Sequence, residues 1–219
     1  MQVVVGGIKG GSGKTTLATN LAVIRSLEGK KVLLVDADEQ KSASDWAQQR
    51  ATLNIEDLLT TIQLSGKGVY SQLQKMGADY DDVIIDVGGR DTTSQRSALT
   101  IADLFLIPFK PRSLDIWTVG AVKAMISEIR AVNPGLVCIA MINQADSRGS
   151  DNDDALQILK ETSDILCFEG SIGHRKSFGN AAAEGLGVVE LKEQDKKATQ
   201  EIRALYEYVY NECFACGLK

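Results

Sequence analysis

The sequence lacks an apolar run of about twenty residues, which is the length that a helix needs to cross a bilayer. Met1 leads directly into a strand-like stretch, without the charged and apolar regions of a secretory signal. We therefore expect neither a membrane span nor an export signal. Histidine occurs once, at His174, and the sequence offers no catalytic partner for it, so we interpret it as a surface or loop residue.

The sequence also lacks an excess of basic residues, since its formal net charge is −5. This charge argues against a generally basic nucleic-acid-binding protein and leaves room for a local basic patch. The four cysteines are scattered apart from Cys213 and Cys216, which end an amphipathic helical pattern. Because no second pair or nearby histidine accompanies them, we expect reduced thiols used in packing, not a metal or redox site.

Proline is scarce, with three residues, and no proline-rich linker, internal repeat or low-complexity segment divides the chain. With 219 residues, 44% of them hydrophobic, the sequence predicts a single α/β domain over residues 1–219. Apolar runs predict strands at 2–7, 31–36, 60–64, 82–87, 103–108, 136–142 and 165–168. Helical patterns lie at 14–28, 42–51, 69–77, 92–101, 114–132, 151–162, 175–184 and 195–213. This alternation is typical of a doubly wound, mostly parallel sheet flanked by helices.

One glycine-rich loop stands between the first predicted strand and the first predicted helix. It reads Lys9-Gly10-Gly11-Ser12-Gly13-Lys14-Thr15-Thr16. Three glycines allow the backbone N–H groups to point inward around a phosphate, Lys14 adds a positive charge, and the Thr15 hydroxyl can bind Mg²⁺. We therefore predict a nucleotide-binding loop of a P-loop NTPase. The general pattern would require glycine at position 8, where this chain has Ile8, and an additional lysine, Lys9, precedes the glycines.

This loop resembles the deviant Walker A motif of the ParA/MinD superfamily of dimerising ATPases. The resemblance implies that Lys14 holds the phosphates of ATP in its own subunit, and that Lys9 reaches the ATP of a second subunit. It implies ATP and Mg²⁺ as ligands, an ATP-induced homodimer and catalytic roles for both lysines.

Acidic residues end two of the predicted strands. Asp36 ends the second strand, Asp38 follows it, and Asp86 lies at the end of the fourth. Carboxylates at the tips of buried strands are suited to Mg²⁺ and to a metal-bound water. By resemblance, Asp36 lies near the metal, Asp38 positions the attacking water, and Asp86 is the Walker B carboxylate. The alternative reading is that these residues form ordinary polar turns and caps.

Two departures from the family pattern accompany these carboxylates. Glu39 replaces a usual proline after Asp38, and Gly88-Gly89 stands where relatives more often have two prolines. We expect the glycine pair to make a mobile segment that senses the γ-phosphate.

Further along the chain, Asn143 ends the sixth predicted strand. In the resembled family an asparagine at the matching place reads the adenine edge, because a side-chain amide offers both a donor and an acceptor. The alternative is an ordinary turn asparagine. The segment 171–185 resembles a family loop that covers the base, and the segment 113–116 resembles one that contributes to the dimer face.

Together these features predict a slow Mg²⁺-dependent ATPase, most like the small partition proteins. The resemblance implies a dimer that binds DNA without sequence preference and a ParB-type or small centromere-binding partner that stimulates hydrolysis. We expect a cytoplasmic, nucleoid-associated protein without membrane binding. Candidate DNA contacts are Lys160, Arg175, Lys176, Lys192, Lys196, Lys197 and Arg203. The alternatives are a related ATPase that positions a protein cargo or a conjugation or secretion apparatus, and a P-loop metabolic enzyme.

Overall fold

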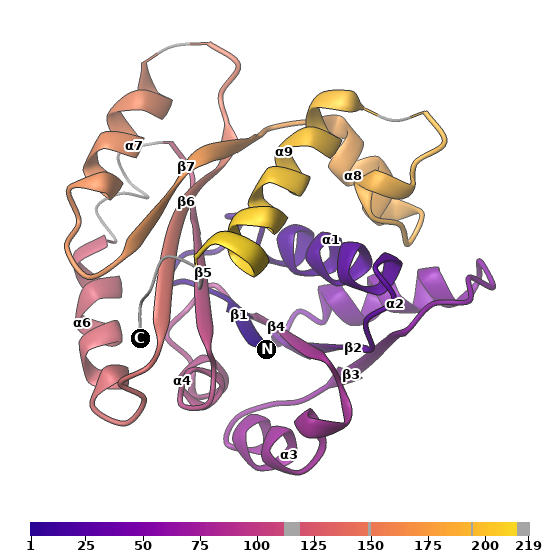
Figure 1. Ribbon diagram of the computed structural model, residues 1–219, viewed down its shortest axis with the longest axis horizontal. Helices are drawn as coiled ribbons and strands as arrows, with labels where there is room; N and C mark the ends of the chain where they lie inside the picture. The colour runs from indigo at the N-terminus through magenta and orange to yellow at the C-terminus, as the bar shows by residue number, and fades with distance from the viewer. Residues whose placement is uncertain (112–118, 149, 194, 214–219) are drawn as a thin grey trace.

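A parallel β-sheet forms the centre of the molecule (Figure 1). The computed structural model describes residues 1–111, 119–148, 150–193 and 195–213. Within these residues the sheet has seven strands in the order β3-β2-β4-β1-β5-β6-β7, and every neighbouring pair is parallel. The strands are β1 (Gln2–Val5), β2 (Val32–Ala37), β3 (Leu59–Gln63), β4 (Asp82–Val87), β5 (Leu104–Phe109), β6 (Val137–Ala145) and β7 (Leu166–Gly173).

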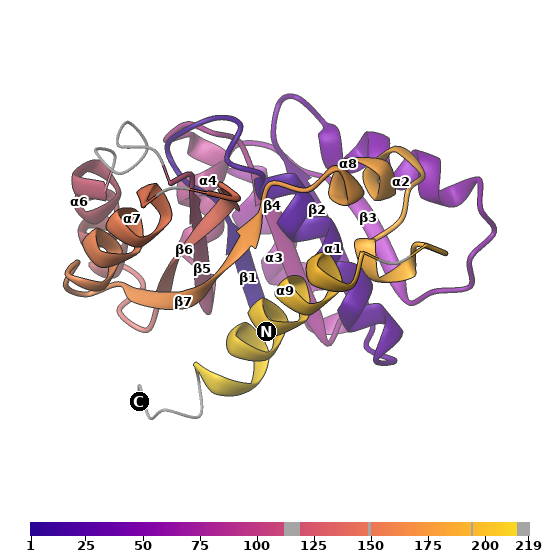
Figure 2. The same ribbon diagram turned by 90° about the horizontal axis from the view of Figure 1, so that it is seen from above.

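Helices cover both faces of the sheet, as Figures 1 and 2 show. One face carries α1 (Lys14–Leu27), α2 (Ser42–Ala51), α8 (Lys176–Ala183) and α9 (Lys196–Glu207). The other carries α3 (Gly68–Met76), α4 (Thr93–Leu99), α6 (Val119–Arg130) and α7 (Asp151–Lys160). Single turns of 3₁₀-helix, η1 (Gly77–Asp79) and η2 (Val188–Glu190), and the π-helical turn η3 (Tyr208–Glu212) complete the described helices.

The sequence of the central strands explains this layering. Successive side chains of a strand point to opposite faces, so Val3 and Val5 pack in the core beneath α1, and Val4 packs in the core on the other face. All three valines are fully buried. Where helices cover both faces of a parallel sheet, both sets of side chains are buried, so a central strand is apolar at every position.

The predicted doubly wound fold is confirmed, with some differences in the element bounds. β7 continues to Gly173 instead of ending at residue 168, because Ser171 and Ile172 resume pairing with β6 after an irregularity in the register. α9 ends at Glu207, where the chain continues as a π-helical turn. The residues predicted at 113–116 for a dimer face, the start of the helix predicted at 114–132, and Cys216 lie outside the described residues.

Candidate nucleotide-binding site

The predicted phosphate loop joins β1 to α1 at the carboxyl edge of the sheet. Gly11 (φ 72°) and Gly13 (φ 84°) adopt left-handed conformations that favour glycine. A Cβ on Gly13 would also stand 2.3 Å from Nδ2 of Asn143. Lys14 is the first residue of α1 and is buried, and its Nζ donates to the backbone oxygen of Lys9 at 3.2 Å. The loop thus curls around the lysine at the N-terminus of a helix, which is the geometry that binds phosphate.

A cleft of about 1040 Å³ opens above this loop. Its lining combines the phosphate loop with segments that follow β2 and β4 and with helices α2 and α8. Its lining residues include Thr16, Thr19, Asp38, Trp46, Gln49, Gly88, Gly89, Gln144, Ala182 and Ala183. A cleft of this volume is in the upper range of small-molecule sites and accommodates a nucleoside triphosphate.

A hydroxyl and a carboxylate meet at the base of the cleft. Oγ1 of Thr15 donates to Oδ2 of Asp86 at 2.6 Å, whereas Oδ1 of Asp86 is buried without a hydrogen-bond partner. Burial, together with the neighbouring carboxylates of Asp36 and Asp38, raises the pKa of Asp86 to about 7, although Thr15 and Lys14 oppose the shift. A buried oxygen left without a partner is costly. Mg²⁺ would satisfy it, so the residues fit the predicted cation.

The described residues contain no group of three or more histidine, cysteine or acidic side chains that forms a metal cage. Mg²⁺ does not require one, because it keeps several waters and binds through one or two protein groups together with phosphate oxygens. Thr15 and Asp86 supply such groups. Burial lowers the pKa of Lys14, against the opposing effects of Asp86 and Asp38, so an additional anion at the loop would stabilise its charged form.

Asp36 and Asp38 differ in their surroundings. Asp36 is fully buried, and its Oδ2 accepts hydrogen bonds from the backbone N and Oγ of Ser44, both at 2.7 Å. It lies beside Asp86 in the register of β2 and β4, so it is close to the predicted metal position. Both of its oxygens have protein partners, since Oδ1 accepts from the backbone N of Asp38 at 3.2 Å. Asp38 is half-buried and lines the cleft. Its Oδ1 accepts from the backbone N of Gln40 at 3.1 Å.

The glycine pair after β4 packs against Asp38 and against the phosphate loop. A Cβ on Gly88 would lie 3.2 Å from Oδ1 of Asp38, and one on Gly89 would lie 2.4 Å from Cα of Gly10. The segment predicted to sense the γ-phosphate therefore packs directly on the phosphate loop. The two glycines that replace the usual prolines permit this close approach.

Asn143 lies beneath the loop. It is 3% exposed, and its Nδ2 donates to the backbone oxygen of Ser12 at 2.6 Å. Its predicted contact with adenine stays a prediction, and in this structure the amide supports the phosphate loop. The next residue, Gln144, lines the cleft and donates to the backbone oxygen of Gly11 at 3.0 Å.

Sequence reasoning missed three residues around the cleft: Gln144, Trp46 and Gln95. Gln95 is fully buried, and its Oε1 accepts from the backbone N of Gly7 at 2.9 Å. The only sequence signal for Gln144 was its position directly after Asn143. Gln95 and Trp46 carry no local motif, because their partners lie far away in the chain.

The seven cations predicted to contact DNA divide into two sets. Lys160 forms an ion pair with Glu169 at 2.8 Å, and Arg175 forms one with Glu201, with Nε and Oε2 2.9 Å apart. The remaining five are exposed on α8, on α9 and in the connection between them: Lys176, Lys192, Lys196, Lys197 and Arg203. We call these five residues the α8–α9 basic face. His174 is exposed in the loop after β7, as predicted.

Comparison with known proteins identifies the family. The sequence profile described as the CobQ/CobB/MinD/ParA nucleotide binding domain matches residues 3–188, which include the phosphate loop, both acidic motifs and Asn143. The chain belongs to this family. The match confirms the resemblance to the ParA/MinD superfamily that the loop predicted.

Individual members of the CobQ/CobB/MinD/ParA family are similar to this chain over much of its length. "Maintenance of carboxysome distribution protein A" from Halothiobacillus neapolitanus is 29% identical over 209 residues, which cover 94% of each chain. The "Chromosome-partitioning ATPase Soj" of Thermus thermophilus is 27% identical over 161 residues, covering 61% of this chain and 65% of that protein. Among solved structures, a variant of McdA from Cyanothece in complex with ATP has a TM-score of 0.76 at 18% identity, covering 93% and 95% of the two chains.

None of the helices in the described part of the chain is long and apolar enough to cross a bilayer.

Proposed function

We propose that this protein is an ATPase whose ATP-bound form is a dimer that binds DNA. The observation that carries the proposal is the cleft above the phosphate loop, where buried Lys14 and the Thr15–Asp86 pair lie side by side. Lys14 supplies positive charge for the β- and γ-phosphates, and the N–H groups of Gly10, Gly11, Ser12, Gly13, Lys14, Thr15 and Thr16 surround them. The ATP-bound Cyanothece structure of the same fold supports ATP as the ligand.

Each of the acidic side chains has a distinct role in this proposal. Thr15 and Asp86, with Asp36 beside Asp86, would hold Mg²⁺, which would neutralise charge on the phosphates. Asp38 is half-buried in the cleft beside Gly88 and orients the attacking water. P-loop hydrolysis needs an oriented nucleophile and stabilised phosphate charge more than a strong general base. Slow turnover follows, and a partner protein would accelerate it.

The second lysine of the motif is the residue to which we assign dimer formation in this proposal. Lys9 precedes the glycines and is absent from the residues that line the cleft of its own subunit. We propose that Lys9 of one subunit contacts the ATP of the other, so that ATP joins the two subunits. Hydrolysis then releases them.

We propose DNA as the surface to which the dimer binds, through the α8–α9 basic face. Dimerisation doubles this face, and binding through lysine and arginine to phosphates has no sequence preference. The similarity to Soj supports partition of a plasmid or chromosome, with a ParB-type or small centromere-binding protein as the partner that stimulates hydrolysis. This proposal places the protein in the cytoplasm, on the bacterial nucleoid.

One comparison favours a protein cargo as the alternative to a partitioned plasmid or chromosome. The Halothiobacillus protein, whose alignment covers 94% of this chain, is named for the distribution of carboxysomes. An ATPase that moves a protein cargo over DNA would use the same cleft, dimer and basic face. The product of the adjacent gene distinguishes the two: a small DNA-binding protein supports partition, and a cargo component supports positioning.

The experiment is a gel shift with random duplex DNA at several salt concentrations. We expect binding with ATP and Mg²⁺, little binding with ADP, and an affinity that falls steeply as salt rises. A variant with Lys196 and Lys197 replaced by alanine serves as the test of the basic face. The matched control is alanine at Lys67, which directly precedes α3, and at Lys75 within α3. Binding to DNA that is independent of ATP, or no binding at all, would contradict the proposal.

A further inference from the structure

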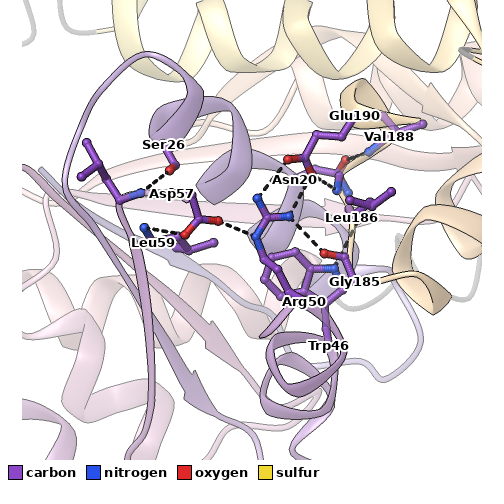
Figure 3. A network of polar contacts seen from close by, with 12 residues as sticks. Asn20, Ser26, Trp46, Arg50, Asp57, Leu59, Gly185, Leu186, Val188 and Glu190 are labelled. Carbon is purple, nitrogen blue, oxygen red and sulfur yellow. Dashed lines mark hydrogen bonds and ion pairs between the residues drawn. The ribbon is translucent and has the colours of Figure 1, made fainter. Parts of the chain in front are cut away.

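A buried arginine joins two segments that are distant in the sequence (Figure 3). Arg50 lies in the last turn of α2 and is 7% exposed. Its guanidinium makes a two-pronged contact with Glu190, with both N–O distances 2.9 Å, and donates to the backbone oxygen of Gly185 at 3.0 Å. It also pairs with Asp57 at 2.6 Å.

The partners of Arg50 differ in what they connect. Asp57 is only seven residues further along the chain, in the connection from α2 to β3. Gly185 and Glu190 follow α8 and lie 135 and 140 residues away. Although burial alone lowers the pKa of Arg50, its hydrogen bonds to Glu190 and Asp57 raise it above the ordinary value, so the guanidinium stays charged.

Two further contacts bring α2 and the segment after α8 together. Nε1 of Trp46 donates to the backbone oxygen of Leu186 at 3.2 Å, and the Arg50 guanidinium lies over the Trp46 ring at 5.4 Å. Gly185 (φ 71°) packs on the backbone of α2 so closely that a Cβ there would be 2.4 Å from the N of Arg50. The side chains in Figure 3 accordingly converge from both segments on one guanidinium.

Helices α2 and α8 form one wall of the nucleotide cleft. Trp46 and Gln49 of α2 line it together with Ala182 and Ala183 of α8, and Thr19 of α1 also lines the cleft. At its other end α2 is held by the two hydrogen bonds from Ser44 to Asp36. The helix is therefore fixed at its start to the acidic motif and at its end to the segment after α8.

We propose that Arg50 is a positioning residue, whose contacts with Glu190 and Gly185 hold the wall formed by α2 and α8 at the distance that bound ATP requires. This inference rests on the proposed ATP-binding function. The phosphates lie at the loop, and the wall bounds the part of the cleft that continues along α1 past Thr16 and Thr19. Loss of the contacts of Arg50 with Glu190 and Gly185 widens this part of the cleft and weakens binding of the nucleoside. Lys14 and the phosphate loop keep their geometry.

The test compares two variants that each remove one carboxylate from the same guanidinium. Glu190→Gln removes the ion pair between Arg50 and the segment after α8, and Asp57→Asn leaves that ion pair intact. The general loss of stability that comes from removing one carboxylate partner of a buried arginine is therefore matched between the two variants. Both are made in a Trp117→Phe background, so that tryptophan emission reports on Trp46 in the cleft wall.

We expect Glu190→Gln to raise the KM and Kd for ATP about ten-fold while kcat stays within about two-fold, because a wall that contacts only the nucleoside binds the ground state and the transition state equally. Competition by inorganic tripolyphosphate, which lacks a nucleoside, should be unchanged. Asp57→Asn should keep the parental KM. ATP should alter Trp46 emission in the parent and in Asp57→Asn, and alter it less in Glu190→Gln.

Arg50→Lys provides a second variant, because lysine keeps the charge but cannot make the two-pronged contact. It should reproduce the rise in KM. Equal KM values for the parent, Glu190→Gln and Arg50→Lys would overturn the inference, as would an equal rise in Asp57→Asn. A parental protein that does not bind ATP would instead contradict the proposed function, so the two failures are distinguishable.

Discussion

The contact between Gly89 and the phosphate loop leads to a quantitative prediction for Gly89→Ala. The new Cβ would stand 2.4 Å from Cα of Gly10 and 2.8 Å from the carbonyl carbon of Lys9. Carbon atoms in contact are about 3.5–4.0 Å apart, so the two segments must separate by at least about 1 Å. Overpacking of this kind costs about 1–3 kcal/mol. For a chain of this size the melting temperature of the nucleotide-free protein should fall by roughly 3–10 °C.

Thermal unfolding followed by circular dichroism measures this shift. The matched control is Gly179→Ala in α8, where a Cβ would meet nothing within 4 Å. Alanine is the better helix former by about 0.5–1 kcal/mol, so the control should melt at or slightly above the parental temperature. A Gly89→Ala variant that melts with the parent would show that the glycine pair does not pack on the phosphate loop in solution.

Four further predictions concern single side chains. Lys14→Ala should abolish ATP binding in calorimetry, because the buried charge at the loop is lost; normal affinity would contradict its role. Asp38→Ala should still dimerise with ATP but hydrolyse it slowly, and parental turnover would move the water-positioning role elsewhere. Asn143→Ala should weaken ATP and GTP alike by about 1–3 kcal/mol, since the Ser12 oxygen loses its partner; a loss for ATP alone would favour base reading. Asp195 caps α9, and its hydrogen bonds from Ala198, Ser177 and Lys197 lower its pKa below that of an ordinary aspartate. Asp195→Ala should therefore cost about 1 kcal/mol in urea unfolding at neutral pH. This difference should shrink as pH falls below the pKa of an unfolded aspartate and the parental carboxylate protonates. A difference that is constant with pH would refute the charge argument.

The position of the cleft was predictable because its determinants are local. The loop from Lys9 to Thr16 needs glycines for its backbone and a lysine at the helix start, and all of these are neighbours in the chain. Asp38 and Asp86 were found because parallel strands bring their carboxyl ends to one edge of the sheet. Strand periodicity likewise predicted the buried sheet and the two helical layers.

Residues that act through distant partners were not predictable in this way. Asn143 was placed at the end of the right strand, but only the packed structure puts its amide under Ser12 and leaves Gln144 facing the cleft. A one-residue difference at a strand end moves a side chain to the opposite face, and sequence spacing does not fix it.

The sequence by itself determined the phosphate loop, the acidic strand ends and the family, because each depends on a few adjacent residues and on the period of apolar positions. Only the tertiary structure decided that Gly89 packs on Gly10 and that Arg50 meets Glu190. These contacts join segments 79 and 140 residues apart. Their geometry depends on how whole helices pack on the sheet, and no local sequence pattern encodes that packing.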